Sequence, residues 1–110
     1  ALQVAEGFAR TWRRVGIALD RIGLLVDDRN RSGGLFYLRI SDDFREKIKE
    51  DKGWLANLFG NNKVELKDRY LLRVEDKNTQ TEISIYEATG AKADDRFAKQ
   101  LLADLKLYLD

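Results

Sequence analysis

Three pairs of neighbouring aspartates are the residues with the clearest potential for metal or acid–base chemistry: Asp27-Asp28, Asp42-Asp43 and Asp94-Asp95. Adjacent carboxylates can bind a cation or share a proton in acid–base catalysis. None of these pairs has the glycine and the spaced oxygen ligands of a calcium loop. Two of the pairs instead precede stretches with helical spacing, where carboxylates cap the first turn. We therefore predict turn and capping roles for all three pairs, and no metal site.

Other catalytic constellations are absent from the sequence. The chain has no His and no Cys, so it lacks the commonest general base, the commonest metal ligand and the thiolate nucleophile. No Ser or Thr therefore has a histidine to activate it. Gly33-Gly34 connects two expected strands and is followed by neither Lys-Ser/Thr nor a helix, so it is a turn and not a phosphate loop. The sequence predicts no enzymatic activity and no cofactor.

A cluster of arginines offers binding chemistry instead. Four arginines and one isoleucine share the solvent-facing side of a helix expected over residues 8–22: Arg10, Arg13, Arg14, Arg21 and Ile17. Guanidinium groups bind phosphates or carboxylates through paired hydrogen bonds, and an apolar residue ringed by arginines suits a partner surface. The alternative is an ordinary solvated helix face. Only Asp20 is expected to offset the positive charge.

A second binding candidate is an apolar cluster in an expected helical insert over residues 43–62, between two strands. It consists of four large apolar residues bracketed by glycines: Trp54, Leu55, Leu58 and Phe59. Such residues can fold back over the domain's own core or over a sheet edge. They can also present an aromatic anchor to another protein, since clusters of this kind dominate interface energetics. Membrane insertion is a lesser alternative, because the segment is short and Lys52 and Lys63 are its only flanking cations.

The helix that presents the arginines is predicted from its apolar spacing. Its other side carries residues that recur every three or four positions: Phe8, Trp12, Val15, Leu19 and Ile22. This spacing places them on one stripe of a helix, and Gly23 suits the left-handed cap that ends a helix. Because Trp12 lies on this stripe, we expect it in the core and not in a binding site.

Alternating apolar residues and turn signals predict a sheet. Five strands are expected, over residues 2–4, 24–31, 35–41 and 64–74 and around residues 83–85. Ser32-Gly33-Gly34 can adopt positive φ at little steric cost, which favours a hairpin between the second and third strands. Strands joined in this way favour a mostly antiparallel sheet.

A C-terminal helix is expected to begin near Asp94 or Asp95. Its apolar stripe is broad, as expected for a helix laid deep across a curved sheet: Phe97, Ala98, Leu101, Leu102, Leu105, Tyr108 and Leu109. Asp43 and Glu46 are spaced as a capping box for a short helix in the insert. The order of elements predicts a single α+β domain over residues 1–110 with a helix-grip-like fold. In this fold a mostly antiparallel curved sheet packs against the long C-terminal helix, with an N-terminal helix and a short helical insert.

The composition is that of a soluble globular domain, with 44% apolar and 35% charged residues. A chain of 110 residues is long enough for one hydrophobic core but not for two. Its 20 basic and 19 acidic residues nearly cancel, so bulk charge predicts no nucleic-acid partner and no anionic lipid. No apolar run approaches the roughly 20 residues of a membrane-spanning helix. The chain has no Met, and we expect it to be a segment of a longer protein.

Two groups of these residues form a family-like pattern. The first is Phe8…Trp12…Val15…Ala18-Leu19…Gly23-Leu24…Val26…Asp28-Arg29…Arg31-Ser32-Gly33-Gly34. The second is Tyr70-Leu71-Leu72-Arg73-Val74, then Thr81-Glu82-Ile83-Ser84-Ile85, then Gly90 and a leucine-rich helix. Together they resemble the repeated domain of the BamC (lipoprotein-34) family, whose members belong to the outer-membrane β-barrel assembly machinery. Lys52-Gly53-Trp54-Leu55…Leu58-Phe59 is also similar to a segment carried by some members.

The resemblance implies a setting and a function. Family members are built from two helix-grip domains behind a disordered N-terminal arm, are anchored through a lipidated cysteine, and have no enzymatic activity. The chain is then expected to be the C-terminal domain, at the periplasmic face of the outer membrane, held there only by a lipid anchor outside this segment. Its expected role is non-catalytic interaction with other subunits of the assembly machinery. The alternative is a carrier of a small lipophilic ligand, because a sheet curled around a helix can enclose an apolar cavity.

Overall fold

The computed structural model describes residues 1–50 and 66–109. Its elements are, in order, β1 (Leu2–Val4), α1 (Phe8–Ile22), β2 (Leu25–Asn30), β3 (Leu35–Arg39), α2 (Asp42–Glu50), β4 (Arg69–Asp76), β5 (Thr81–Glu87) and α4 (Arg96–Leu109). The predicted apolar cluster of the insert lies outside the described residues: Trp54, Leu55, Leu58 and Phe59.

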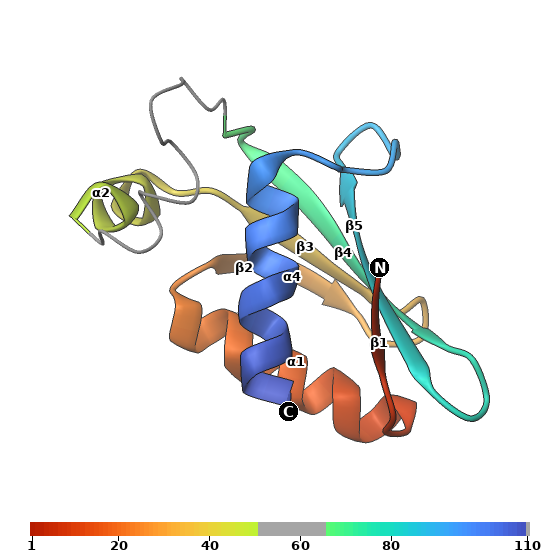
Figure 1. The fold of residues 1–110 in the computed structure, drawn as a ribbon. Helices are drawn as coiled ribbons and strands as arrows, with labels where there is room; N and C mark the ends of the chain where they lie inside the picture. The colour runs from red at the N-terminus through yellow and green to blue at the C-terminus, as the bar shows by residue number, and fades with distance from the viewer. Residues whose placement is uncertain (51–65, 110) are drawn as a thin grey trace.

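The described strands form one sheet with the order β1-β5-β4-β3-β2, in which every neighbouring pair is antiparallel. Both long helices cover the same face of the sheet (Figure 1). Helix α4 contacts β1 and β5, whereas α1 contacts β2 and β4 and packs against α4. The predicted α+β class, with an antiparallel sheet against a long C-terminal helix, is confirmed.

Helix α1 has the predicted amphipathic character and the predicted end. Four stripe residues are buried beneath it: Trp12, Val15, Leu19 and Ile22. Gly23 follows with a φ of 94°, and its N–H donates to the carbonyl groups of Leu19 and Asp20. This left-handed cap satisfies carbonyl groups that the last helical turn would otherwise leave without donors. The core position of Trp12 is confirmed.

The predicted hairpin between β2 and β3 is present, but β2 contains a β-bulge. Val26 pairs with Leu38 and Asp28 pairs with Tyr37, so Asp27 is an extra residue in the strand. A bulge of this kind shifts the side-chain alternation of the strand that carries it. The bulge therefore decides which charged side chains of β2 face the helices.

The two helices that follow the hairpin begin at different kinds of cap. The Phe44 N–H donates to the Ser41 hydroxyl oxygen over 3.1 Å, and α2 already includes Asp42 and Asp43. Ser41 is therefore the N-cap, and the predicted capping box starting at Asp43 is wrong. The prediction for α4 is correct, because Asp95 Oδ1 accepts the Ala98 N–H over 2.9 Å just before the helix begins.

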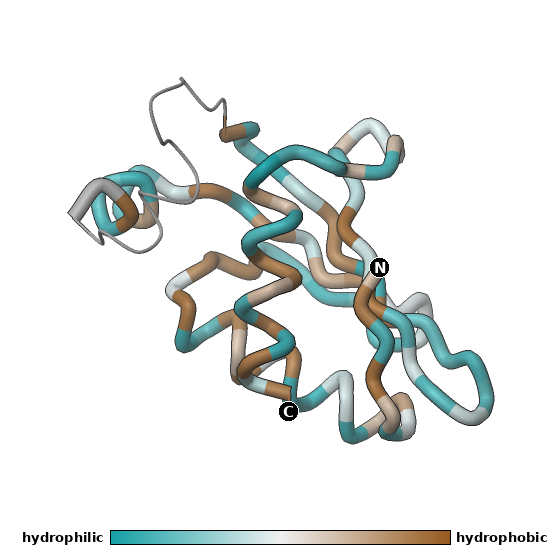
Figure 2. Tube along the Cα trace, viewed as in Figure 1, coloured by the Kyte–Doolittle hydropathy of each residue, from teal (hydrophilic) through white to brown (hydrophobic). Residues whose placement is uncertain are grey.

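The hydrophobic core lies between the sheet and the two long helices. Figure 2 shows hydrophobic residues along α4 and the strands behind it, and hydrophilic residues in the loop between β4 and β5. Five large side chains of the core are fully buried, with no exposed surface: Phe36, Tyr70, Phe97, Leu101 and Leu105. Tyr108 was expected on the apolar stripe of α4, but it is 42% exposed. The last turn of α4 therefore presents part of its stripe to solvent.

The buried Tyr70 makes the stability of this core depend on pH. Its hydroxyl group donates to Asp95 Oδ2 over 2.8 Å and accepts the Lys67 N–H over 3.2 Å. Burial is the main cause that raises the pKa of Tyr70 well above its ordinary value, and Asp95 raises it further. The unfolded chain ionises this phenol near pH 10, whereas the folded chain keeps it neutral. Its contribution to stability is therefore complete below about pH 10 and is lost progressively as the pH rises above that value.

We expect Tyr70→Phe to flatten the alkaline loss of stability, because phenylalanine has no proton to release. The measurement is the free energy of unfolding from urea titrations at a series of pH values on both sides of about pH 10. Tyr37→Phe, on the outer face of the sheet, is the matched control and should retain the alkaline loss. An unchanged pH dependence in Tyr70→Phe would contradict the assignment.

Candidate functional site

The arginine face of α1 is more neutralised than its sequence indicates. Glu6, in the turn before the helix, forms an ion pair with Arg10 over 2.7 Å and a second ion pair with Arg14. Arg14 also donates to the Tyr108 carbonyl oxygen over 3.0 Å, which ties α1 to the end of α4. The expectation that only Asp20 offsets these arginines is therefore wrong, because the chain turn before Phe8 brings Glu6 alongside them.

The predicted residues of this face differ in their availability. The Arg10 side chain is 70% exposed despite its ion pair, whereas the Arg14 side chain is 28% exposed. Arg13 is exposed. Ile17 is 51% exposed. Arg10, Arg13 and Ile17 thus form the accessible part of the face, and Arg14 serves in part to join elements within the chain.

A groove between α1 and β2 brings three of these predicted residues together with two arginines that the sequence did not indicate. It measures about 700 Å³ and is lined by Ala9, Arg10, Trp12, Arg13, Gly16, Ile17, Arg29 and Arg31. We call it the α1–β2 groove. Four of its lining residues are arginines and none is acidic. The groove is therefore a concave basic surface with an apolar component.

The bulge in β2 explains how Arg29 reaches this groove. If Asp27 were paired regularly and β2 had no bulge, strand alternation from Val26 would place Asp28 on the helix-covered face and Arg29 on the outer face. In the structure Arg29 pairs with the buried Phe36 and its guanidinium lies over that ring, 5.6 Å from the centroid. Arg31, in the turn that follows β2, also lines the groove. Periodicity alone could not reveal Arg29, since the bulge inverts it.

One residue of each acidic pair lies at a structural position in the fold. Asp27 lies between Arg39 and Arg69, at 3.0 and 3.4 Å, on the outer side of the hairpin. Asp42 begins α2 and Asp95 caps α4. Within residues 1–50 and 66–109, no group of three or more acidic side chains is arranged to hold a metal ion.

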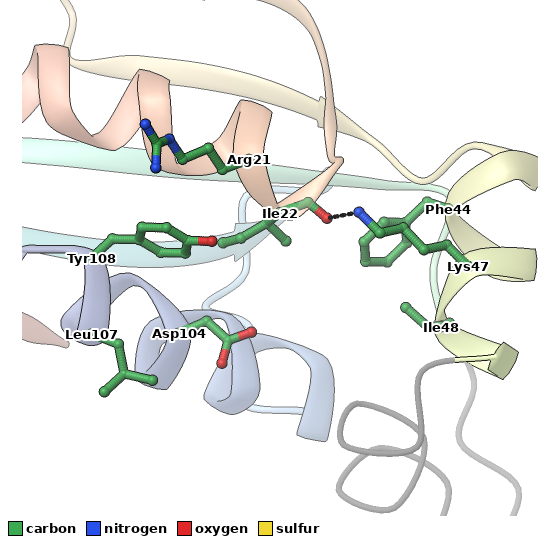
Figure 3. A pocket seen from close by; sticks show the side chains of 8 residues that line it. All are labelled: Arg21, Ile22, Phe44, Lys47, Ile48, Asp104, Leu107 and Tyr108. Atoms are coloured by element: carbon green, nitrogen blue, oxygen red, sulfur yellow. Dashed lines mark hydrogen bonds between the residues drawn. The ribbon is translucent and has the colours of Figure 1, made fainter.

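A second pocket, of about 350 Å³, lies where α1, α2 and α4 meet (Figure 3). Its lining combines apolar and charged side chains: Arg21, Ile22, Phe44, Lys47, Ile48, Asp104, Leu107 and Tyr108. The Lys47 ammonium group donates to the Ile22 carbonyl oxygen over 3.1 Å and so crosses between α2 and the end of α1. Tyr108 directs its hydroxyl group towards Ile22, while Leu107 is 79% exposed.

The interior between the sheet and α4 is filled by side chains. Tyr70 and Phe97 lie with their rings 4.5 Å apart, and Phe97 also meets Phe44 edge-on at 6.3 Å. These ring contacts join α4 to β4 and to α2 within the core. Among the helices that the structure describes, none has both the length and the hydropathy needed to cross a membrane.

Comparison with known proteins places this fold in a biological setting. Residues 1–109 match the family described as the outer membrane protein assembly factor BamC-like C-terminal domain. The chain is 33% identical over 105 residues to the outer membrane protein assembly factor BamC of Accumulibacter regalis, a match that covers 93% of the chain and 27% of the relative. It is 50% identical over 58 residues to the protein of the same name from Thiobacillus denitrificans, covering 52% of the chain and 16% of the relative. The chain thus spans only a minor part of the relatives that it matches.

Proposed function

Since the chain belongs to the C-terminal domain family of BamC-like outer membrane protein assembly factors, we propose that it is a non-catalytic protein-interaction domain. In this role it docks other subunits of the β-barrel assembly machinery and so supports insertion of barrel proteins into the outer membrane. The family match over residues 1–109 is the observation that carries the proposal. It is supported by a surface with a basic groove and exposed apolar residues, a mixture suited to protein partners.

Two surfaces are proposed to contact the partner subunits. The first is the apolar segment Trp54, Leu55, Leu58 and Phe59, on the sequence argument that large apolar residues act as interface anchors. The second is the arginine face of α1, formed by Arg10, Arg13, Arg14 and Ile17. On this face the exposed Ile17 supplies apolar area, and Arg13 supplies a guanidinium group that has no ion pair among the described residues.

The proposed location is the periplasmic face of the outer membrane, through a lipid anchor elsewhere in the full-length protein. The proposal includes no nucleic-acid partner and no cofactor. The near balance of 20 basic and 19 acidic residues supports this, because non-specific nucleic-acid binding depends on an excess of positive charge.

Site-specific photo-crosslinking in the native envelope tests the proposal. A crosslinking amino acid is placed in the full-length protein at Phe59 or at Ile17, and the adducts are identified by mass spectrometry. We expect adducts with another subunit of the assembly machinery from at least one of these positions. The control position is Thr89, an exposed residue in the turn after β5, from which no such adduct is expected. Adducts confined to the chain itself at both test positions would contradict the proposal.

A further inference from the structure

The α1–β2 groove concentrates positive charge on one part of the surface. Arg10 and Arg13 line its α1 side, Arg29 and Arg31 line its β2 side, and no acidic residue is among the eight that form it. The bulge keeps the carboxylates of Asp27 and Asp28 out of the groove: Asp27 is paired with Arg39 and Arg69 on the other side of the strand, and Asp28 lies opposite Tyr37 on that same side. The groove is thus a site of concentrated positive charge on a domain whose formal net charge is only +1.

Two of the four arginines are held in place by the fold. Arg10 is oriented by its ion pair with Glu6, and the Arg29 guanidinium rests over the Phe36 ring. Cation–π contact of this kind leaves the edge of the guanidinium group free to donate hydrogen bonds. Arg13 and Arg31 are exposed and form no ion pair with any residue that the structure describes. A ligand would therefore meet partly preorganised donors as well as free ones.

We propose that the α1–β2 groove binds an acidic peptide segment of a partner protein, with its carboxylates paired to Arg13, Arg29 and Arg31. This inference rests on the proposed function and specifies the chemistry of one partner. Charge complementarity argues for an acidic occupant, since guanidinium groups bind carboxylates bidentately. Ile17, half exposed on the rim, and the edge of Trp12 provide apolar contact for side chains between the carboxylates.

The concave shape favours a peptide over a lipid surface. Arg10 and Arg13 line one side of the groove and Arg29 and Arg31 the other, so a chain lying in the groove passes between the two pairs. Planar arrays of lipid headgroups would instead require basic residues spread over a flat or convex face. A peptide segment can place carboxylates against both sides at once, which a membrane plane cannot do.

Fluorescence anisotropy with a labelled peptide tests the inference on the purified full-length protein. The probe alternates glutamate with leucine, and the comparison peptide carries glutamine in place of every glutamate. We expect the acidic probe to bind roughly tenfold or more tightly than the glutamine peptide at low salt, and to weaken as salt is added. The double variant Arg13→Glu/Arg31→Glu should lose this binding.

A charge-matched control separates the groove from net charge. Arg96→Glu/Lys99→Glu makes the same change in charge on exposed residues near the start of α4, and it should bind the acidic probe as the unmodified protein does. Arg13→Gln/Arg31→Gln is a milder variant that serves if the charge reversal perturbs folding. It should weaken binding of the acidic probe, but less than the charge reversal does. Equal binding of the two peptides, or loss of binding in the α4 control alone, would overturn the inference.

The lipid alternative and the proposed function are tested separately. Binding of the protein to vesicles with phosphatidylglycerol is compared with its binding to neutral phosphatidylcholine vesicles. The peptide assignment would be overturned if the protein bound the anionic vesicles through Arg13 and Arg31 but did not bind the acidic probe. The Ile17 and Phe59 crosslinks are then repeated in the Arg13→Glu/Arg31→Glu background. Unchanged crosslinks to assembly subunits would show that docking stands while the acidic-segment inference fails.

Discussion

Replacement of Trp12 by alanine is expected to lower the free energy of unfolding by about 3–5 kcal/mol, as for other buried aromatic side chains. Trp12 is 8% exposed, stacks on Phe36 with ring centroids 4.0 Å apart, and lies 5.8 Å from the Phe8 ring. It thus joins α1 to β3, and its removal would leave a cavity beneath the helix. Remaining neighbours can close such a cavity only in part.

Urea titration and thermal unfolding measure this effect. For a domain of this size each kcal/mol corresponds to roughly 4–8 °C in Tm, so we expect a decrease of more than about 10 °C. Trp12→Phe, which keeps a ring against Phe36, is the matched control and should be considerably less destabilising. A decrease of only a degree or two in the alanine variant would contradict a core role for this residue.

Replacement of Gly34 by alanine is expected to be destabilising by about 2–5 kcal/mol, from backbone strain of about 1–2 kcal/mol and steric overlap of about 1–3 kcal/mol. Gly34 closes the hairpin between β2 and β3 with a φ of 70°. Its carbonyl oxygen accepts the Val74 N–H over 2.7 Å, and a Cβ added there would lie 2.2 Å from the Val74 carbonyl oxygen. The new methyl group would therefore force the hairpin away from β4.

Gly90 provides the control for this prediction. It has a φ of 96°, but an added Cβ would meet no atom within 4 Å. Gly90→Ala therefore introduces comparable backbone strain without the steric overlap, and the difference between the two variants in urea titrations isolates the overlap. Equal losses of stability in both would contradict the close approach of Gly34 to β4.

The local elements could be predicted because they depend on interactions within one helix or one turn. The apolar repeat that ends at Gly23 predicts α1, and the aspartates at positions 94 and 95 predict the start of α4. The sequence pattern places the cap of α2 at Asp43, whereas the structure places it at Ser41, which accepts the Phe44 N–H. Ser and Asp are both common capping residues, so their order in the sequence does not decide between them. Sequence signals of this kind locate the first residue of a helix to within one or two positions.

The candidate site was predictable only in part. Helical periodicity places Arg10, Arg13 and Ile17 on an exposed side of α1, and the structure agrees. It does not reveal that Glu6 neutralises two arginines of that face, because this pairing depends on the path of the chain between β1 and α1. Glu6 and Arg10 are four residues apart, but Glu6 precedes the helix, so its contacts with Arg10 and Arg14 depend on the conformation of the turn.

The sequence by itself determined the α+β class, the amphipathic faces of α1 and α4 and the turn at Gly34, because hydrophobic periodicity and glycine conformation act locally. Only the tertiary structure decided the composition of the α1–β2 groove. One extra residue, Asp27, inverts the alternation of β2, so that its carboxylates face outwards while Arg29 lies on the side of α1, where Arg31 of the following turn also lines the groove. A bulge becomes apparent only when β2 is paired with β3, since it is a property of register between two strands and not of either strand alone.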